Sequence, residues 1–435
     1  MTGRGASATL TGGMHDESEP FGLCWGQQWS WHEQQAPAAQ RPPGLINGAL
    51  LDLPANVGGE DVRAVLRVLL SRHQSLRTSC LPGDDGAPCQ RVWPVSEERY
   101  ELGGFVDAGR CDEWLRRPMD VRSGWPVRAA VVRPDAGPAR LGLAVHHLAA
   151  DRLGFGVLWE ELRHVVDAAG RGEAPALPPA GRQPADVAAF ERSPAGVAVN
   201  ERAIAHWLDQ DGALGEVLDW LRRTFGEPGD TMHVARVVSA SGRRRLGELA
   251  EATGGSEASV AVAAVGCVLS RHLGRATFPM TMSVSNRHLP GLARSVCSVA
   301  QSGLVRVAVA DPSDLAAAVP DAWSGMLAAI QHAYYSGDEL SERMRAFDSG
   351  GLHVTAAPPN VNVVTAAALD PPRGRAGDEP WTSSVGQVRQ RCASLFFHVR
   401  LSESHLEIEL RAGAHLLPAG DGLALVADAM RLIHR

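Results

Sequence analysis

The sequence of 435 residues contains no lysine, so arginine accounts for all 42 residues counted as Lys+Arg. A chain without lysine cannot form a Schiff base with a carbonyl substrate, which excludes pyridoxal-phosphate and lysine-aldolase chemistry. The P-loop of nucleotide-hydrolysing enzymes needs a lysine to reach the phosphates, and protein kinases need one for the same purpose. These enzyme classes are therefore excluded.

Cysteine is present without a recognisable pattern. The seven cysteines are odd in number and irregular in spacing, and no two of them form a C-x-x-C pair. A disulfide framework or a structural zinc site would require such a pattern. We therefore expect a reduced protein of the cytoplasm that has no metal site.

Long hydrophobic runs and an excess of positive charge are also missing. The longest uninterrupted apolar run, residues 260–269, is far shorter than the ~20 residues of a membrane span. Residues 1–20 are polar and lack the apolar stretch of a signal peptide. The net charge of −7 argues against a nucleic-acid partner. The sequence thus predicts neither a membrane nor a nucleic acid as partner.

The composition, with 45% hydrophobic and 21% charged residues, is that of a globular protein. Apolar spacing and capping residues predict helices that begin near residues 59, 152, 256, 315 and 420, the fourth of them broken near Pro320. Alternating patterns predict strands at 44–53, 141–147, 278–285, 360–365, 394–401 and 403–411. Helices and strands are mixed throughout, which predicts an α/β or α+β fold with two lobes.

The domain organisation follows from a linker rich in Gly, Ala and Pro at residues 170–184. We expect a flexible leader at residues 1–20, an N-terminal lobe at 21–175 and a C-terminal lobe at 176–435. The Pro- and Gly-rich stretch 366–384 predicts a mobile loop.

The segment that carries chemistry contains two adjacent histidines, His146 and His147, followed by Asp151. Neighbouring residues at the end of a strand point to opposite faces, so these two imidazoles do not converge on one metal ion. One can face a cavity while the other packs inside, and Asp151 can cap the following helix. A neutral imidazole suits proton transfer near pH 7, but a histidine at a strand end can equally be structural.

This segment resembles the HHxxxDG hallmark of the condensation domains of nonribosomal peptide synthetases. Cys24 to Trp31 is similar to the opening S-x-A-Q-x-x-x-W motif of that family, and Arg72 to Thr78 to its RHExLRT motif. Weaker similarities lie at Asp186 to Phe190, His206-Trp207, Asn286-Arg287 and Cys297 to Ser302. The resemblance extends over residues 20–435.

The resemblance implies two lobes with the chloramphenicol-acetyltransferase fold, arranged as a V around a central tunnel. Donor and acceptor thioesters, held on the phosphopantetheine arms of carrier proteins, would enter this tunnel from opposite faces. By the same resemblance His147 faces the tunnel as the catalytic residue, and His146 is structural. Asp151 pairs with Arg287 and holds the loop of His147.

The sequence departs from the family motifs at several positions. Arg152 replaces the glycine after the aspartate, where it can narrow the tunnel or contact an anionic acceptor. Gln301 and Ser302 replace an Asn-Thr pair, so the tunnel lining differs. Gln74 stands for the glutamate of the RHExLRT motif, and Asn286 for the glycine before Arg287. These departures indicate a specialised member of the family.

The leading hypothesis is a free-standing, monomeric condensation enzyme with no bound cofactor. It would form an amide between a carrier-bound acyl or aminoacyl thioester and an amine, either a small molecule or a second carrier-bound acceptor, and meet its carrier proteins in trans. Three alternatives remain at this stage. They are an ester-forming or coenzyme-A-dependent acyltransferase of the same fold, a non-catalytic module that recruits partner enzymes to a carrier protein, and an epimerase.

Overall fold

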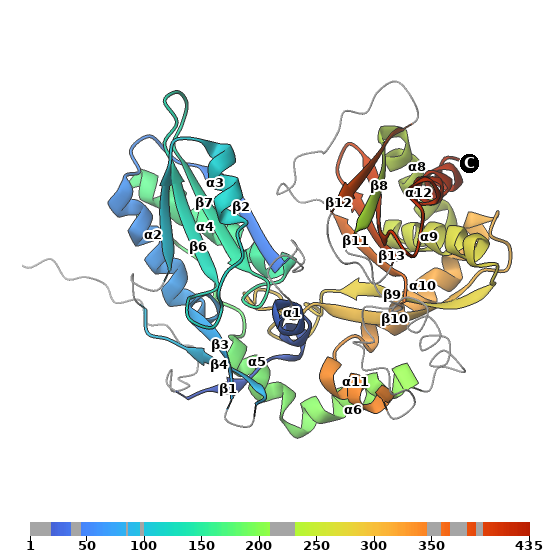
Figure 1. Ribbon diagram of the computed structural model, residues 1–435, viewed down its shortest axis with the longest axis horizontal. Helices are drawn as coiled ribbons and strands as arrows, with labels where there is room; N and C mark the ends of the chain where they lie inside the picture. The colour runs from blue at the N-terminus through green and yellow to red at the C-terminus, as the bar shows by residue number, and fades with distance from the viewer. Residues whose placement is uncertain are drawn as a thin grey trace, which may run out of the picture.

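The computed structural model is built of helices and sheets in two lobes, which lie side by side with helix α1 (Trp25–Gln35) between them (Figure 1). It describes residues 19–35, 45–83, 86–95, 100–208, 231–345, 358–365, 381–388 and 395–435. The predicted mixture of helix and sheet is confirmed. The predicted leader falls almost wholly outside the described residues.

The first lobe is built on a four-stranded sheet with the order β2-β7-β6-β5. Its strands are β2 (Ile46–Asp52), β5 (Glu101–Phe105), β6 (Val127–Val132) and β7 (Arg140–His146). Its helices are α2 (Gly59–Arg72), α3 (Ala108–Leu115) and α4 (Arg152–Arg171). The predicted strand at 44–53 and the helices from 59 and 152 are confirmed within a few residues.

The alternation along β7 decides which helices cover the two faces of this sheet. Leu141, Leu143 and Val145 pack with residues of α2 and α4 in one hydrophobic cluster. Ala144, whose side chain lies on the opposite face of the strand, packs against Cys111 and its neighbours on α3. Both faces of the strand are buried, which is why its sequence is almost entirely apolar.

The chain also forms a second, three-stranded sheet, a 3-10 helix and two helices that lead toward the other lobe. The strands have the order β1-β4-β3, with bounds β1 (Phe21–Gly22), β3 (Thr78–Pro82) and β4 (Pro88–Val92). The 3-10 helix η3 (Gln74–Arg77) precedes β3. Helices α5 (Pro184–Glu191) and α6 (Pro194–Leu208) then run beneath α1 toward the other lobe (Figure 1). Residues 173–183, inside the predicted linker, form neither helix nor strand.

The second lobe is built on a seven-stranded sheet with the order β10-β9-β11-β13-β14-β8-β12. Among the described strands of this sheet, only β11 pairs in parallel, with both of its neighbours. The strands are β8 (Met232–Ser239), β9 (Thr277–Val284), β10 (Gln301–Ala308), β11 (Asn360–Thr365), β12 (Thr382–Val388), β13 (Leu395–Leu401) and β14 (Leu406–Gly413). The helices are α8 (Ala240–Thr253), α9 (Glu257–Leu273), α10 (Leu315–Gln331), α11 (Gly337–Arg345) and α12 (Ala419–His434).

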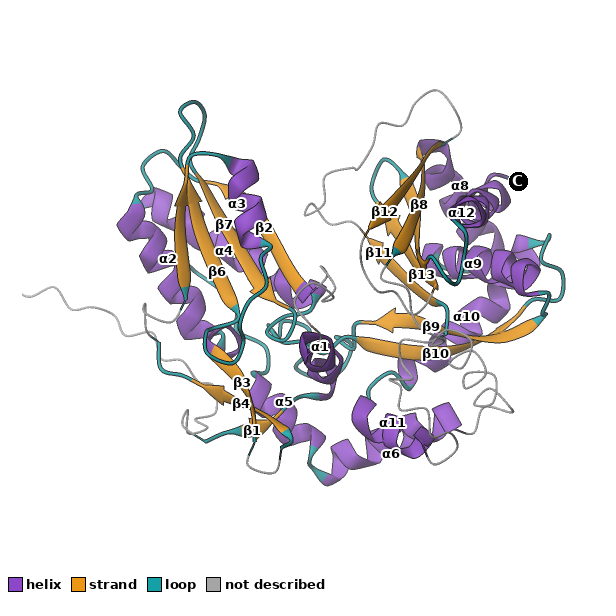
Figure 2. Cartoon of the chain, in the orientation of Figure 1, coloured by secondary structure: helices purple, strands orange, loops and turns teal. Residues whose placement is uncertain are grey.

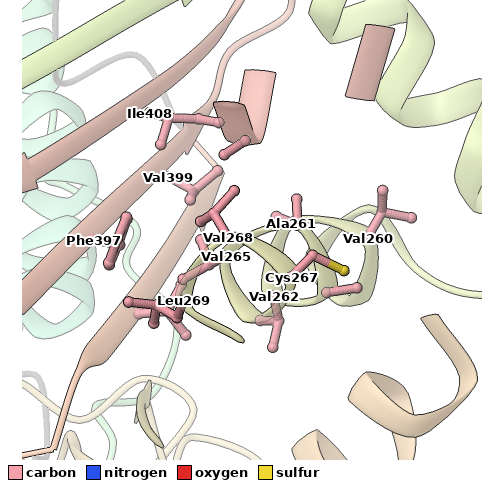
Figure 3. Packing of buried hydrophobic residues seen from close by; sticks show 14 of the residues in the cluster. Val260, Ala261, Val262, Val265, Cys267, Val268, Leu269, Phe397, Val399 and Ile408 are labelled. Carbon is pink, nitrogen blue, oxygen red and sulfur yellow. The ribbon is translucent and has the colours of Figure 1, made fainter. Parts of the chain in front are cut away.

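Helix α9 forms the centre of the C-terminal core. Ser256 caps its N-terminus, and its residues from Ser259 to Ser270 are all buried. Val265, Val268 and Leu269 lie close to Phe397, Val399 and Ile408 of β13 and β14 (Figure 3). Burial of each such valine or leucine contributes roughly 1.5–3 kcal/mol. Helices α8, α9 and α12 lie on the face of the sheet that points away from the first lobe (Figure 1).

A segment of the second lobe crosses into the first. The chain leaves β9 at Val284 and returns to β10 at Gln301, and we call residues 285–300 the crossing loop. Val296 of this loop is 2% exposed and belongs to the hydrophobic core of the first lobe. Leu292, Cys297 and Val299 pack with Cys24 and residues of α5. The loop lies beside α1 at the centre of the molecule (Figure 2).

Two sequence expectations are wrong. Helix α10 continues through Pro320 without a break. Pro320 lies near the helix N-terminus and is exposed, so the carbonyl group that loses its partner can bond to water. The predicted loop 366–384 also ends too late, because residues 382–384 belong to β12. Its first fifteen residues, 366–380, lie outside the described residues.

Among the described residues no single helix is long and apolar enough to cross a membrane. Helices α8 and α9 taken together have the length and apolar composition of a span, but they are bent by 100° where they meet.

Gly26 of α1 packs closely against the backbone of the crossing loop. A Cβ atom at this position would lie 2.5 Å from the carbonyl oxygen of Ser298 and 2.7 Å from Cα of Val299. We expect Gly26→Ala to lower the free energy of unfolding by about 1–3 kcal/mol, because backbone atoms of the crossing loop must move. Urea denaturation measures this change.

The matched control is Gly156→Ala in α4, where no atom lies within 4 Å of the added methyl group. This variant should gain about 0.5–1 kcal/mol from the helix preference of alanine. A Gly26→Ala protein as stable as the wild type would contradict the close docking of the crossing loop against α1.

Candidate active site

The two adjacent histidines lie where β7 turns into α4. Strand β7 ends at His146, and the N–H of His147 donates to the carbonyl oxygen of Leu45 at 2.6 Å. Asp151 is the N-cap of α4, since its Oδ1 accepts the N–H of Gly154 at 2.7 Å. The turn between strand and helix is therefore held at both ends by hydrogen bonds, and the one at the helix end is a cap that the local sequence dictates.

The two imidazoles have different environments. His146 is 1% exposed; the N–H of Leu148 donates to its Nδ1 at 3.1 Å, and its Nε2 lies 3.1 Å from Oε1 of Gln34. His147 is only half-buried. The structure thus places His146 inside the first lobe and His147 at the junction of the lobes.

Asp151 connects the two lobes through four hydrogen bonds to one carboxylate. Its Oδ1 accepts from the N–H of Gly154 and from Nη2 of Arg287, both at 2.7 Å. Its Oδ2 accepts the N–H groups of Val299 and Ala300 at 2.9 and 3.0 Å. The side chain is 2% exposed, so the charge is buried but fully hydrogen-bonded.

Arg287 and the residue before it shape the crossing loop. Nη1 of Arg287 donates to the carbonyl oxygens of Leu292 and Ser295 at 2.9 and 2.7 Å, which closes the loop on itself. Asn286 has a φ of 56° and donates from Nδ2 to the carbonyl oxygen of Val299 at 2.9 Å. Asparagine is one of the few residues besides glycine that tolerate this left-handed conformation, which accounts for its presence where the family motif has glycine.

His147 is surrounded by groups from both lobes. Its Nδ1 lies 3.1 Å from Oγ of Ser30 on α1 and 3.2 Å from Oγ of Ser298 in the crossing loop. The indole of Trp29 packs edge-on against the imidazole, with 5.6 Å between the ring centroids. Burial lowers the pKa of His147, and the negative charge of Asp151 opposes this effect in part. His147 is therefore neutral at pH 7.

The remaining predicted residues do not gather around His147. The side chain of Gln301 is engaged elsewhere, because its Nε2 donates to the carbonyl oxygen of Tyr335 at 2.6 Å. The carbonyl oxygen of Ser302 accepts the hydroxyl of Tyr335 at 2.7 Å. Arg152 is exposed at the first turn of α4. Burial lowers the pKa of His398 on β13, and the charges of Arg411, Arg400 and Arg152 lower it further. Arg152 therefore lies toward the sheet of the second lobe.

That sheet carries an ionic cluster on the face opposite its helices. Arg236, Arg400 and Arg411 surround Glu407 and Glu409, two glutamates whose side chains are at most 3% exposed. The three guanidinium groups lower the pKa of Glu409 to about 2 despite its burial. The sheet face therefore has fixed charges beside Arg152, with one more arginine than glutamate.

The segment that resembles the RHExLRT motif connects α2 to α4. Nε of Arg72 donates to Oε2 of Glu161 at 2.8 Å, and Nε2 of His73 lies 2.7 Å from the same oxygen. Arg77 is 4% exposed and donates to the carbonyl oxygens of Leu70 and Trp93 at 3.0 and 2.5 Å. These contacts support the fold of the first lobe and do not reach His147.

Sequence reasoning missed Ser30 and Ser298 as individual residues, although both lie in segments that resemble family motifs, at 24–31 and 297–302. They become neighbours only when α1 and the crossing loop pack together. Among the described residues no three of the types His, Cys, Asp and Glu lie close enough to hold a metal ion together.

Comparison with known families identifies this chain, because the sequence profile of the Condensation domain matches residues 41–353. The chain is a member of the condensation-domain family of nonribosomal peptide synthetases. Domains of this family transfer acyl or peptidyl groups that carrier proteins present on phosphopantetheine arms.

Curated relatives are large synthetases. Phosphinothricin tripeptide synthetase PhsC of Streptomyces viridochromogenes is 28% identical over 306 residues, which are 64% of this chain and 26% of that protein. Nonribosomal peptide synthetase kk1B of Curvularia clavata is 27% identical over 308 residues, 66% of this chain and 2% of that protein. The chain thus spans about a quarter or less of the length of these relatives.

Solved structures share the fold. The condensation domain that mediates chain release from the enacyloxin polyketide synthase superimposes with a TM-score of 0.73 at 19% identity, over 99% of this chain and 84% of that one. The first condensation domain of the calcium-dependent antibiotic synthetase gives 0.69 at 20% identity over 96% of both chains. The X-domain from teicoplanin biosynthesis gives 0.67 at 19% identity, over 95% and 94%.

The buried pair of Asp151 and Arg287 leads to a prediction for stability. Asp151→Asn removes the charge from a carboxylate position that faces four donors and leaves Arg287 without its counter-ion. We expect the free energy of unfolding to fall by about 3–5 kcal/mol, as for other broken buried pairs. Turnover should fall together with the folded fraction, and both are measured on the same preparation.

Asp112→Asn is the control, because Asp112 forms an exposed ion pair with Arg116 and its loss should change stability little. An Asp151→Asn protein of wild-type stability that has lost turnover would show instead that the carboxylate takes a direct part in the chemistry.

Proposed function

We propose that the protein joins a carrier-bound acyl or aminoacyl thioester to an amine, with His147 as the catalytic residue. The observation that carries this proposal is the placement of one imidazole. His147 is neutral, lies at the junction of the lobes, and is bonded at Nδ1, while the described residues give its Nε2 no hydrogen-bond partner. Nε2 is therefore the nitrogen that can receive a proton.

The chemistry requires one proton to move twice. The amine nitrogen attacks the thioester carbonyl carbon, and Nε2 of His147 takes a proton from the nitrogen as the new C–N bond forms. The tetrahedral intermediate then collapses, the C–S bond breaks, and the imidazolium returns the proton to the departing thiolate. The products are an amide and a free phosphopantetheine thiol, and no cofactor is consumed.

The surrounding groups support this role by fixing the position of the imidazole. Asp151 and Arg287 hold the turn that carries His147. The residue before it, His146, is held inside the lobe by its contact with Gln34. We propose that the substrates meet in a tunnel between the lobes and reach Nε2 from opposite faces. Bringing both reactants into one site replaces a bimolecular encounter and lowers the entropic cost of the reaction.

The first test is His147→Ala, assayed by intact mass spectrometry of a loaded carrier protein incubated with an amine acceptor. Loss of the base should slow carrier unloading and amide formation by about 10²–10⁴-fold. His164→Ala, which removes an exposed histidine from α4, should keep wild-type turnover. Because the carrier is supplied as a separate protein, the assay also tests whether carriers act in trans.

The pH profile checks the same assignment. A base works when neutral, and burial lowers the pKa of His147, so the acid limb of the turnover profile should have its midpoint below the ordinary histidine pKa of about 6.5. A midpoint above that value, or full activity of His147→Ala, would refute the proposal. Efficient ester formation with an alcohol would favour an ester-forming acyltransferase, and no turnover of any thioester by the wild type would favour a recruiting module.

Arg152 is proposed to act on the acceptor, because its exposed side chain lies beside the charged sheet of the second lobe. If it contacts an anionic acceptor, Arg152→Gly should lower kcat/KM for amines that carry a carboxylate by about tenfold relative to neutral amines. Arg163→Ala removes an exposed arginine from the same helix and serves as the control. Identical acceptor kinetics in Arg152→Gly and the wild type would rule out this contact.

A further inference from the structure

Two serine hydroxyl groups from opposite lobes converge on one nitrogen of His147. Ser30 of α1 and Ser298 of the crossing loop place their Oγ atoms 3.1 and 3.2 Å from Nδ1. Both serines are completely buried, with 0% exposure. The acid–base chemistry at Nε2 does not require either contact, so the two serines have another role at Nδ1.

The hydrogen bonds of Ser298 decide which atom donates. Its hydroxyl donates to the carbonyl oxygen of Gly26 at 3.0 Å, and a carbonyl oxygen can only accept. A serine hydroxyl has a single proton, so Ser298 presents a lone pair to Nδ1. The imidazole must then be the donor in this contact, which places a proton on Nδ1.

This assignment also fixes the state of the second ring nitrogen. A neutral imidazole has only one N–H group, and with that proton on Nδ1 the lone pair lies on Nε2.

We infer that Ser30 and Ser298 are positioning residues that hold the proton of His147 on Nδ1 and so leave Nε2 as the basic nitrogen. This inference rests on the proposed function for its effect on turnover, but not for the tautomer itself. It also couples the base to the docking of the lobes. Ser298 reaches His147 only when the crossing loop is seated against α1 and Asp151.

The direct test is nitrogen NMR of ¹⁵N-histidine-labelled protein without substrate, with the His147 signal assigned by comparison with His147→Gln. We expect wild-type His147 to show a protonated Nδ1 and an unprotonated Nε2 near pH 7. In the double variant Ser30→Ala/Ser298→Ala the Nδ1–H population should decrease. A wild-type signal from the Nε2–H tautomer, or an unchanged signal in the double variant, overturns the inference.

Kinetics provide the second readout. Ser298→Ala should lower kcat about tenfold and the double variant about 100-fold, with little change in KM. The acid limb of the pH profile should also move to lower pH, because acceptors at Nδ1 stabilise the imidazolium. Ser298→Cys keeps the size of the side chain but is a weak acceptor, so it should be as slow as Ser298→Ala. Wild-type kcat in Ser298→Cys would show that the hydroxyl serves packing only.

Ser270→Ala is the control for removing a buried serine, since Ser270 lies in α9 and donates to the carbonyl oxygen of Arg275. It should keep wild-type kcat and the wild-type His147 signal. The two proposals fail separately: an active His147→Ala protein with Nδ1–H in the wild-type spectrum would end the catalytic role and leave the tautomer assignment standing.

Discussion

The carboxylate of Asp151 is the group on which the junction of the two lobes depends. It is buried, and an isolated buried charge would be very costly. Three backbone N–H groups and one guanidinium satisfy its two oxygens, and three of these four donors come from the second lobe. The same side chain also caps α4. One residue therefore ends a strand-to-helix turn, orients the crossing loop, and holds the two lobes in register.

The chemistry of His147 follows from this junction. The turn places His146 inside the lobe and His147 beside α1 and the crossing loop. Burial favours the neutral imidazole, and the nearby carboxylate limits how far its pKa falls. The ring is thus a base whose position depends on contacts from both halves of the chain. A single lobe would supply the histidine but not the environment that tunes it.

The sequence predicts features that depend on neighbouring residues, but not contacts between residues that are far apart along the chain. The strand at 141–147 and the cap of α4 were predictable, because alternation and capping are local patterns. Asp151 and Arg287 are 136 residues apart, and only the family resemblance suggested their pairing. Ser30 and Ser298 were missed because they meet through tertiary packing alone. The break expected at Pro320 was wrong, since an exposed proline near the start of a helix removes only one backbone hydrogen bond, whose carbonyl group can bond to water.

The insertion of Val296 into the core of the first lobe has a consequence for folding. As the chain leaves the ribosome, the first lobe has an incomplete core until β9 and the crossing loop have been synthesised. These contacts join residues far apart in sequence, so they form late and slowly. Calorimetry on the finished chain should therefore record a single cooperative transition, although the outline of the molecule shows two bodies.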